Sequence, residues 1–325
     1  MTDRTIQEQI VKYLGDVHAI EQQALPQVRA APKLAVDPAL VDAFERHIGE
    51  TESQERRVRE RLEELGGSPS KVKDAAGTGS APAFVLFAKS QPDTPGKLVA
   101  HAYSYEHLEL AAYELLSGVA DRGNDGDTAT LATAIAAEER EMAERLAANW
   151  EGAVTASLEA VGRDDLDEQL NKYLGDAHAI EAQALQMLEK AVKVGGDSQL
   201  VEAYSEHLEE TKAHQGRVEA RLEARGAKPN VLKDAAMRLG AINWGAFFAA
   251  QPDNPAKLAG FAFAFEHLEI AGYEQLRRVA ERAGDEDTVR AADSILLEER
   301  AAAESLQGEF DTAVRASLEA LGVVA

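Results

Sequence analysis

The residues of this sequence that could carry chemistry are glutamates and histidines placed where a helix should bury apolar side chains. Glu21 is the clearest case, because Val17, Leu25 and Val28 surround it at helical spacing and it points within roughly 15° of their common direction. A carboxylate that is buried without a partner costs several kcal/mol, so this position needs a counter-charge. A bound divalent metal ion would supply that charge.

The next predicted helix contributes a histidine and a second glutamate. His47 lies within roughly 30° of the apolar seam of this helix, and Glu50, three residues later, shares its face. Gln54 follows four residues after Glu50, and the equivalent position in the second half of the chain is His214. Imidazole groups beside carboxylates are typical ligands of transition metals.

The third and fourth predicted helices each carry a pair of glutamates at or beside the seam. Glu109 lies on the seam side of its helix, whereas Glu106 is further out. Glu138 and Glu139 flank the seam of the last helix so symmetrically that helical geometry does not distinguish them. Each of the four helices therefore offers at least one carboxylate to the interior.

The same residues recur in the second half of the chain, at an offset of 160 positions. Residues 13–21 read YLGDVHAIE and residues 173–181 read YLGDAHAIE, and further matches continue to the end of the sequence. The period is too long for a solenoid repeat, so each copy should be a domain with its own core. We expect domains at 1–162 and 163–325, with the boundary near Gly162–Asp165. The second set of candidate ligands is Glu181, His207, Glu210, Glu266, Glu269, Glu298 and Glu299.

Simpler interpretations exist for each residue alone. A single seam glutamate can lie half-exposed near a helix end or pair with an arginine, and a single histidine such as His47 can be a hydrogen-bonded core residue. The EHLE and EER runs could be solvated faces. The joint pattern, with inward carboxylates from four helices in both halves, favours a dinuclear metal site in each half, with iron or manganese as the metal.

These residues require four helices per half as their scaffold. Apolar residues recur at three- and four-residue spacing in segments at 4–30, from Asp37-Pro38 to Gly66-Gly67, from about 93 to 123, and after Gly126-Asp127-Thr128. Short links should make two antiparallel hairpins, and the long link between them is the connectivity of ferritin-like bundles. Apolar residues in that link predict a short helix in each half: Phe84, Val85, Leu86, Phe87, Trp244, Phe247 and Phe248. The expected fold class is all-α, with two tandem ferritin-like four-helix bundles.

Composition and charge exclude several other classes of function. The chain has 325 residues and a net charge of −23, which disfavours nucleic acids and anionic membranes as partners. It has no cysteine, so disulfides, thiolate metal sites and thiol nucleophiles are absent. The sequence shows no secretory signal and no apolar stretch of membrane-spanning length, and we expect a cytoplasmic protein.

Four motifs of this chain resemble one known family. YLGDxHAIExQxL, FxxHxxET, EHxExAxYExL and the EER of the last helix are similar to the YciE/YciF-like family of bacterial ferritin-like stress proteins, over most of each half. The resemblance implies antiparallel four-helix domains, a dinuclear metal site and a role in the stress response. Carried over by position, it points to Glu21, His47, Glu50, Glu106, Glu109, Glu138, Glu139 and their partners in the second half.

The chain departs from the broader ferritin-like pattern. The usual Glu-x-x-His of the second and fourth helices is absent, because Ser53 follows Glu50 and Glu141 follows Glu138 at that spacing. The tandem arrangement also differs from the single-domain form of the family, and fusion would fix an intramolecular pseudo-dimer that could assemble further into a homo-oligomer. We expect a metal-binding protein that acts in oxidative or general stress, either by binding metal or through oxygen or peroxide chemistry. The alternative is a metal-free helical module with a structural or partner-binding role.

Overall fold

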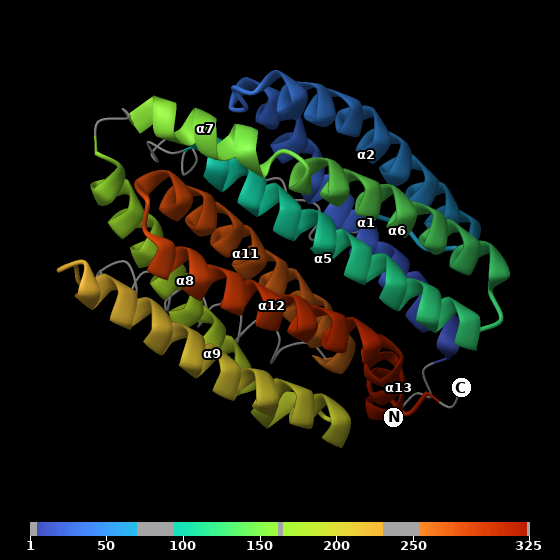
Figure 1. Cartoon of the computed structure of the whole chain (residues 1–325). Helices are drawn as coiled ribbons and strands as arrows, with labels where there is room; N and C mark the ends of the chain where they lie inside the picture. The colour runs from blue at the N-terminus through green and yellow to red at the C-terminus, as the bar shows by residue number, and fades with distance from the viewer. Residues whose placement is uncertain (1–4, 70–93, 162–164, 230–253, 324–325) are drawn as a thin grey trace. The chain divides into compact units, whose positions relative to one another are not determined.

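The computed structural model describes residues 5–69, 94–161, 165–229 and 254–323. Contacts divide the chain into two compact units, Met1–Val161 with Gly322–Ala325, and Gly162–Leu321. The described residues are almost entirely helical, and each unit packs as a helical bundle (Figure 1). The expected all-α fold of two tandem bundles is therefore confirmed.

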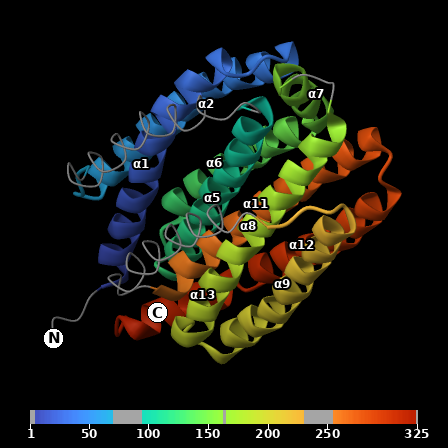
Figure 2. The same ribbon diagram turned by 90° about the vertical axis from the view of Figure 1, so that its left-hand side faces the viewer.

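The first unit is a four-helix bundle with a short fifth helix. The four long helices contact one another in the cyclic order α1, α2, α6, α5, and α7 packs against α5 (Figures 1 and 2). A 3₁₀ turn, Ala31–Lys33, follows the first helix. The helices of this unit are α1 (Ile6–Ala30), α2 (Pro38–Glu64), α5 (Thr94–Arg122), α6 (Gly126–Ala147) and α7 (Trp150–Val161).

Neighbouring helices of this bundle run antiparallel. Arg61, near the end of α2, contacts Thr128 at the start of α6, whereas Glu50 earlier in α2 contacts Arg145 near the end of α6. The other three neighbouring pairs show the same pattern, in which residues later in one helix contact residues earlier in the other. Consequently α2 and α5 lie diagonally and point the same way.

That geometry explains the long connection between the two hairpins. The chain leaves α2 at one end of the bundle and must enter α5 at the other. The 27 residues of α2 span about 40 Å at 1.5 Å per residue, a distance that no tight turn bridges. The short helices predicted in this connection and in its counterpart fall at 70–93 and 230–253, outside the described residues.

The second unit repeats the arrangement. Its long helices contact one another in the order α8, α9, α12, α11, and α13 packs mainly on α11. The helices are α8 (Leu166–Val194), α9 (Ser198–Ala224), α11 (Asn254–Ala283), α12 (Glu286–Gly308) and α13 (Phe310–Ala320). Among the described helices of either unit, none is both long enough and apolar enough to span a membrane.

Local sequence signals set the helix ends. The Asp37 carboxylate accepts hydrogen bonds from the backbone N–H groups of Ala39 and Leu40, as predicted for the start of α2. The helix ends before Gly66, whose φ of +75° is the left-handed conformation that favours glycine. The cap of α6 is Asp125, which accepts from the N–H of Thr128, so this helix begins slightly earlier than the expected Gly126-Asp127-Thr128 signal.

The last segment of each half is two helices rather than the single helix expected from its periodicity. In the first unit the break falls at Ala148–Asn149, where the Asn149 side chain donates to the backbone carbonyl of Arg145. This side-chain bond competes with the helical pattern of backbone hydrogen bonds. Beyond the break, the Trp150 ring packs edge-on against Tyr103 of α5 at 5.2 Å. The break therefore turns α7 onto α5.

Candidate metal centre

The first unit brings four predicted ligands from three helices to one buried place. His47 of α2, Glu106 and Glu109 of α5, and Glu139 of α6 each offer a nitrogen or oxygen atom, and these four atoms lie within 4.8 Å of one another. All four side chains are buried. Because transition metals bind such atoms at about 2.1 Å, opposite ligands of one ion are about 4.2 Å apart. The spacing therefore fits a single ion between them.

Glu21 of α1 supplies a further carboxylate beside this cluster. Its side chain is buried, and one oxygen accepts a hydrogen bond from the hydroxyl of Tyr113. The other oxygen, Oε2, is buried without a hydrogen-bond partner. The tyrosine thus holds Glu21 in one orientation and leaves a lone carboxylate oxygen in the core.

The second unit reproduces both features. His207, Glu266, Glu269 and Glu299 form a buried cluster of the same kind, and the hydroxyl of Tyr273 donates to Glu181. The second unit also has a cluster that the first lacks among its described residues. It consists of Glu181, His214 and Glu299, so Glu299 belongs to both clusters of its unit.

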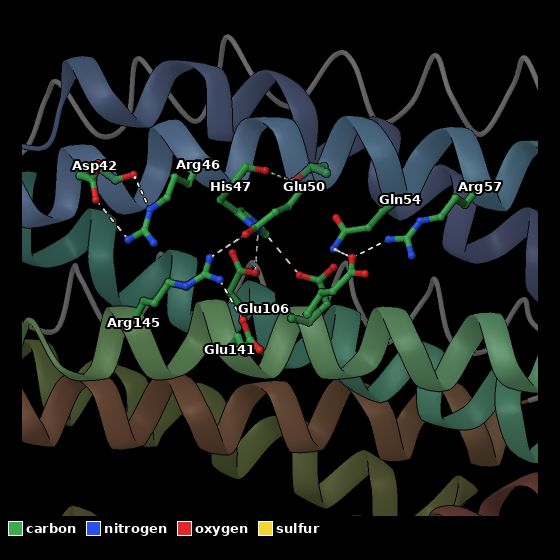
Figure 3. A network of polar contacts seen from close by, with 12 residues as sticks. Asp42, Arg46, His47, Glu50, Gln54, Arg57, Glu106, Glu141 and Arg145 are labelled. Atoms are coloured by element: carbon green, nitrogen blue, oxygen red, sulfur yellow. Dashed lines mark hydrogen bonds and ion pairs between the residues drawn. The ribbon is translucent and has the colours of Figure 1, made fainter.

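Glu50 lies outside the cluster but touches it through His47. Its carboxylate lies 3.1 Å from Nδ1 of His47, and Arg145 donates to both of its oxygens at 2.8 and 2.9 Å (Figure 3). A carboxylate on one ring nitrogen fixes the tautomer of a metal-binding histidine and directs the other nitrogen to the ion. We therefore assign Glu50 as a residue that orients His47.

The corresponding contact in the second unit is weaker. Glu210 lies 3.3 Å from Nδ1 of His207, and Ser305 stands where the first unit has Arg145. The side chain of Glu210 is 48% exposed, against 30% for Glu50. The orienting carboxylate is therefore held less firmly in this unit.

The structure separates the two adjacent glutamates of the last long helix. Glu139 has 1% of its side chain exposed and points into the cluster, whereas Glu138 is 36% exposed and binds Arg57 and Gln54. In the second unit, Glu299 is buried and Glu298 binds Arg217 and His214 in the same way. Glu138 and Glu298 thus lie at the rim, paired with arginines.

Burial sets the protonation of the clustered carboxylates. Desolvation raises the pKa of Glu21 and of Glu181 to about 8, from an ordinary 4.5. Desolvation, reinforced by neighbouring carboxylates, also raises the pKa values of Glu109, Glu139 and Glu269 well above 4.5. Burial disfavours charge on His47, but Glu106, Glu50 and Glu139 outweigh it and raise the pKa of this ring. The clusters therefore hold protons that a metal ion would displace.

The unpaired atoms of the clusters test whether metal ions fit. His47 Nε2 lies 3.1 Å from Glu106 Oε2, yet the two have no hydrogen-bond geometry. Buried polar groups are nearly always hydrogen-bonded, so a group of histidine and carboxylate atoms that lack hydrogen-bond partners and face one point fits a bound cation. The atoms of the first cluster that lack a hydrogen-bond partner are His47 Nε2, Glu106 Oε2, Glu109 Oε1 and both oxygens of Glu139. This donor set, rich in oxygen with one imidazole, fits a divalent metal ion.

Two contributions were not assigned from the sequence. Tyr113 and Tyr273 lie four residues after Glu109 and Glu269, a spacing that places them on the same helix face, but only the fold shows that they reach the first helix of each bundle. His214 was noted as a difference between the halves and was not predicted as a ligand. Its position seven residues after His207 places both rings on one face of α9.

The chain matches one protein family twice. Residues 5–159 and 165–319 each match the family described as Domain of unknown function (DUF892), so the chain belongs to this family as a tandem of two domains. This is the YciE/YciF family that the four sequence motifs resemble, so the family and its tandem repetition in this chain are confirmed. No solved structure matches the chain.

We expect the metal-free chain to lose stability as the pH rises from about 5 to 8.5. Glu21, Glu181 and Glu266 have folded pKa values of about 8, 8 and 7, against 4.5 when unfolded, so the folded state binds more protons in this range. The stabilisation is complete below pH 4.5 and is lost as the pH passes the folded pKa values. A pKa that is higher by one in the folded state than in the unfolded state corresponds to about 1.4 kcal/mol of stability. Urea unfolding in excess chelator measures this trend.

The histidines act in the same direction, because His47 and His207 also have raised pKa values. Glu50, whose pKa is lowered to about 2 by its hydrogen bond from His47, changes stability only below about pH 4.5, outside this window. A free energy of unfolding that rises between pH 5 and 8.5 would contradict buried, protonated carboxylates.

Proposed function

We propose that this chain, a tandem member of the DUF892 family, binds iron or manganese ions in the buried clusters of both units and uses them in oxygen or peroxide chemistry during stress. The observation that carries the proposal is the convergence of unpaired histidine and glutamate atoms inside each bundle. The buried histidine–glutamate clusters could hold metal in both units. The identity of the metal, the reaction and the role in stress belong to the proposal.

The types of side chain in the first cluster favour a transition metal that prefers oxygen ligands and also accepts imidazole. Four of the five residues in and beside the first cluster are carboxylates: Glu21, Glu106, Glu109 and Glu139. Structural zinc sites use mostly thiolate and imidazole ligands, and calcium and magnesium sites rarely use imidazole. Iron and manganese accept both carboxylate and imidazole, and they would supply the redox chemistry that these side chains lack.

The protein's own groups position the ligands and exclude water. Arg145 clamps Glu50, and Glu50 holds Nδ1 of His47, so that Nε2 points into the cluster. Tyr113 donates to Glu21 and leaves its second oxygen free. The cluster side chains are almost fully buried, so electrostatic interactions inside are stronger than in water. Carboxyl groups whose pKa is raised, such as Glu109 and Glu139, give up their protons when an ion binds, and metal affinity should therefore rise with pH.

The stress role rests on the family resemblance, and the rival interpretation of a metal-free module remains open to test. A metal-free module would gain by losing the buried acids, because removing an unpaired buried carboxyl group relieves its desolvation cost. A metal-binding protein would instead lose the stabilisation that bound ions provide.

We predict that Glu139→Ala combined with Glu299→Ala abolishes metal binding in both units. These residues contribute to every described cluster, and their removal leaves too few ligands around each ion. The chain is loaded with Fe(II) under anaerobic conditions, excess metal is removed, and bound iron is counted by elemental analysis. The wild-type chain should retain at least about one ion per unit, and should melt at a higher temperature with metal than in chelator.

The control is Glu141→Ala. Glu141 lies two residues from Glu139 on the same helix, its side chain is 69% exposed, and the second unit already has alanine at the equivalent position, Ala301. This variant should bind as much metal as the wild type. A wild-type chain with less than about a few tenths of an ion per unit after loading, or a double variant that keeps its metal, would refute the proposal in favour of a metal-free module.

We also expect the Fe(II)-loaded chain to consume hydrogen peroxide faster than the same amount of iron in the presence of the double variant. The difference should be at least about tenfold, comparable to the effect of disturbing a metal site in an enzyme. Peroxide is followed by its loss after anaerobic mixing. Equal rates for wild type and double variant would separate metal binding from peroxide chemistry, leaving only the former.

A further inference from the structure

Among the positions at which the two units differ, one is a buried residue beside the clusters. Gln54 of α2 and His214 of α9 are equivalent in the repeat, and both side chains are fully buried. Each lies seven residues after the histidine of its first cluster, on the same helix face. A neutral amide in one unit therefore replaces an imidazole in the other.

In the second unit, His214 completes an additional group of ligands. Its Nδ1 lies 2.8 Å from Glu299 Oε1 and 3.8 Å from Glu181 Oε1, without hydrogen-bond geometry. The other oxygen of Glu299 lies 3.7 Å from His207 Nε2 of the first cluster. Glu299 thus lies between two histidines, as a carboxylate that bridges two ions does.

Nε2 of His214 is occupied at the rim, where it lies 2.7 Å from Glu298 Oε2. This contact leaves Nδ1 directed inward, the arrangement in which a carboxylate on one ring nitrogen prepares the other to bind a metal. The Oε2 atom of Glu181, on the carboxylate that faces this nitrogen, is buried and has no hydrogen-bond partner. The second group therefore presents one imidazole nitrogen and carboxylate oxygens from two helices.

In the first unit, Gln54 makes the contact with the rim carboxylate but has no imidazole nitrogen to offer to the interior. Its Nε2 donates to Glu138 Oε2 at 3.1 Å, the same rim carboxylate that His214 contacts in its unit (Figure 3). The amide oxygen then remains, buried and unpaired. An amide oxygen is a weaker ligand for transition metals than imidazole, and the described residues of this unit contain no second cluster built from histidine and acidic side chains alone.

We propose that the two units bind different numbers of ions, two in the second and one in the first. This inference rests on the proposed function and refines it. Reduction of one hydrogen peroxide to two waters takes two protons and two electrons, and two Fe(II) ions in the second unit can supply one electron each. The first unit would hold a single ion fixed by the Arg145–Glu50–His47 contacts.

The test counts Mn(II) ions and detects whether they are paired. The full chain is stripped with chelator, saturated with Mn(II), freed of excess metal and analysed by elemental analysis and by electron paramagnetic resonance. The three clusters predict about three ions per chain, with one isolated ion and one spin-coupled pair. His214→Gln should lower the count to about two and leave only isolated ions. Gln54→His should raise it to about four and leave only coupled pairs.

Substitution of one ligand assigns the ions to their units. Glu139→Ala should leave about two ions, in the coupled pair, and Glu299→Ala about one, isolated. Thermal unfolding in chelator checks that each variant is folded. Gln54→His is expected to gain an ion, a result that a failure to fold cannot produce. If the wild-type chain binds two or four Mn(II) ions and neither Gln54→His nor His214→Gln changes that number, the units bind equal numbers of ions and this inference is wrong. The proposed metal-binding function would not be affected by that result. A wild-type chain without Mn(II) or Fe(II) would overturn the proposed function itself.

Discussion

Negative charge buried at the centre of each bundle is the constraint on which the rest of the structure depends. In the first unit, four carboxyl groups and one imidazole lie together with almost no contact with solvent, and most of their inward atoms lack a hydrogen-bond partner. Coulomb repulsion between neighbouring carboxylates and the loss of hydration both oppose this arrangement. Protons can neutralise it in part, as the raised pKa of Glu21 shows. Divalent cations would neutralise it and would also bind the atoms that lack hydrogen-bond partners.

The bundle brings the middle turns of all four long helices of the first unit together at this centre. Antiparallel neighbours put the middle of α1, α2, α5 and α6 side by side, and Glu21, His47, Glu109 and Glu139 all lie in those middle turns. A three-residue spacing on α5 adds Glu106 to the same face. Around the centre, Arg57 and Arg145 pair with the rim carboxylates Glu138 and Glu50.

Periodicity and the internal repeat were sufficient to predict the bundles, and they placed Glu21 in the core because a single helix determines which way its side chain points. They could not separate Glu138 from Glu139, since both flank the seam equally and only the position of α2, with Arg57 and Gln54, distinguishes them. Glu50 was predicted as a ligand; it lies beside the cluster, and Arg145, 95 residues away in the sequence, donates hydrogen bonds to its carboxylate. Long-range partners of this kind have no signal in the local pattern.

Duplication allows the two units to diverge while the scaffold is kept. Two of the substitutions that separate them near the clusters, Gln54 for His214 and Arg145 for Ser305, alter candidate ligands and their support while the helices that carry them are retained.

Anomalous scattering from a crystal of the chain soaked in Mn(II) tests the central claim most directly. Convergent, unpaired ligands predict a strong peak between His47, Glu106, Glu109 and Glu139, and another between their counterparts in the second unit. Manganese found only at the rim, beside Glu138 and Glu298, or no peak inside either bundle, would contradict the account.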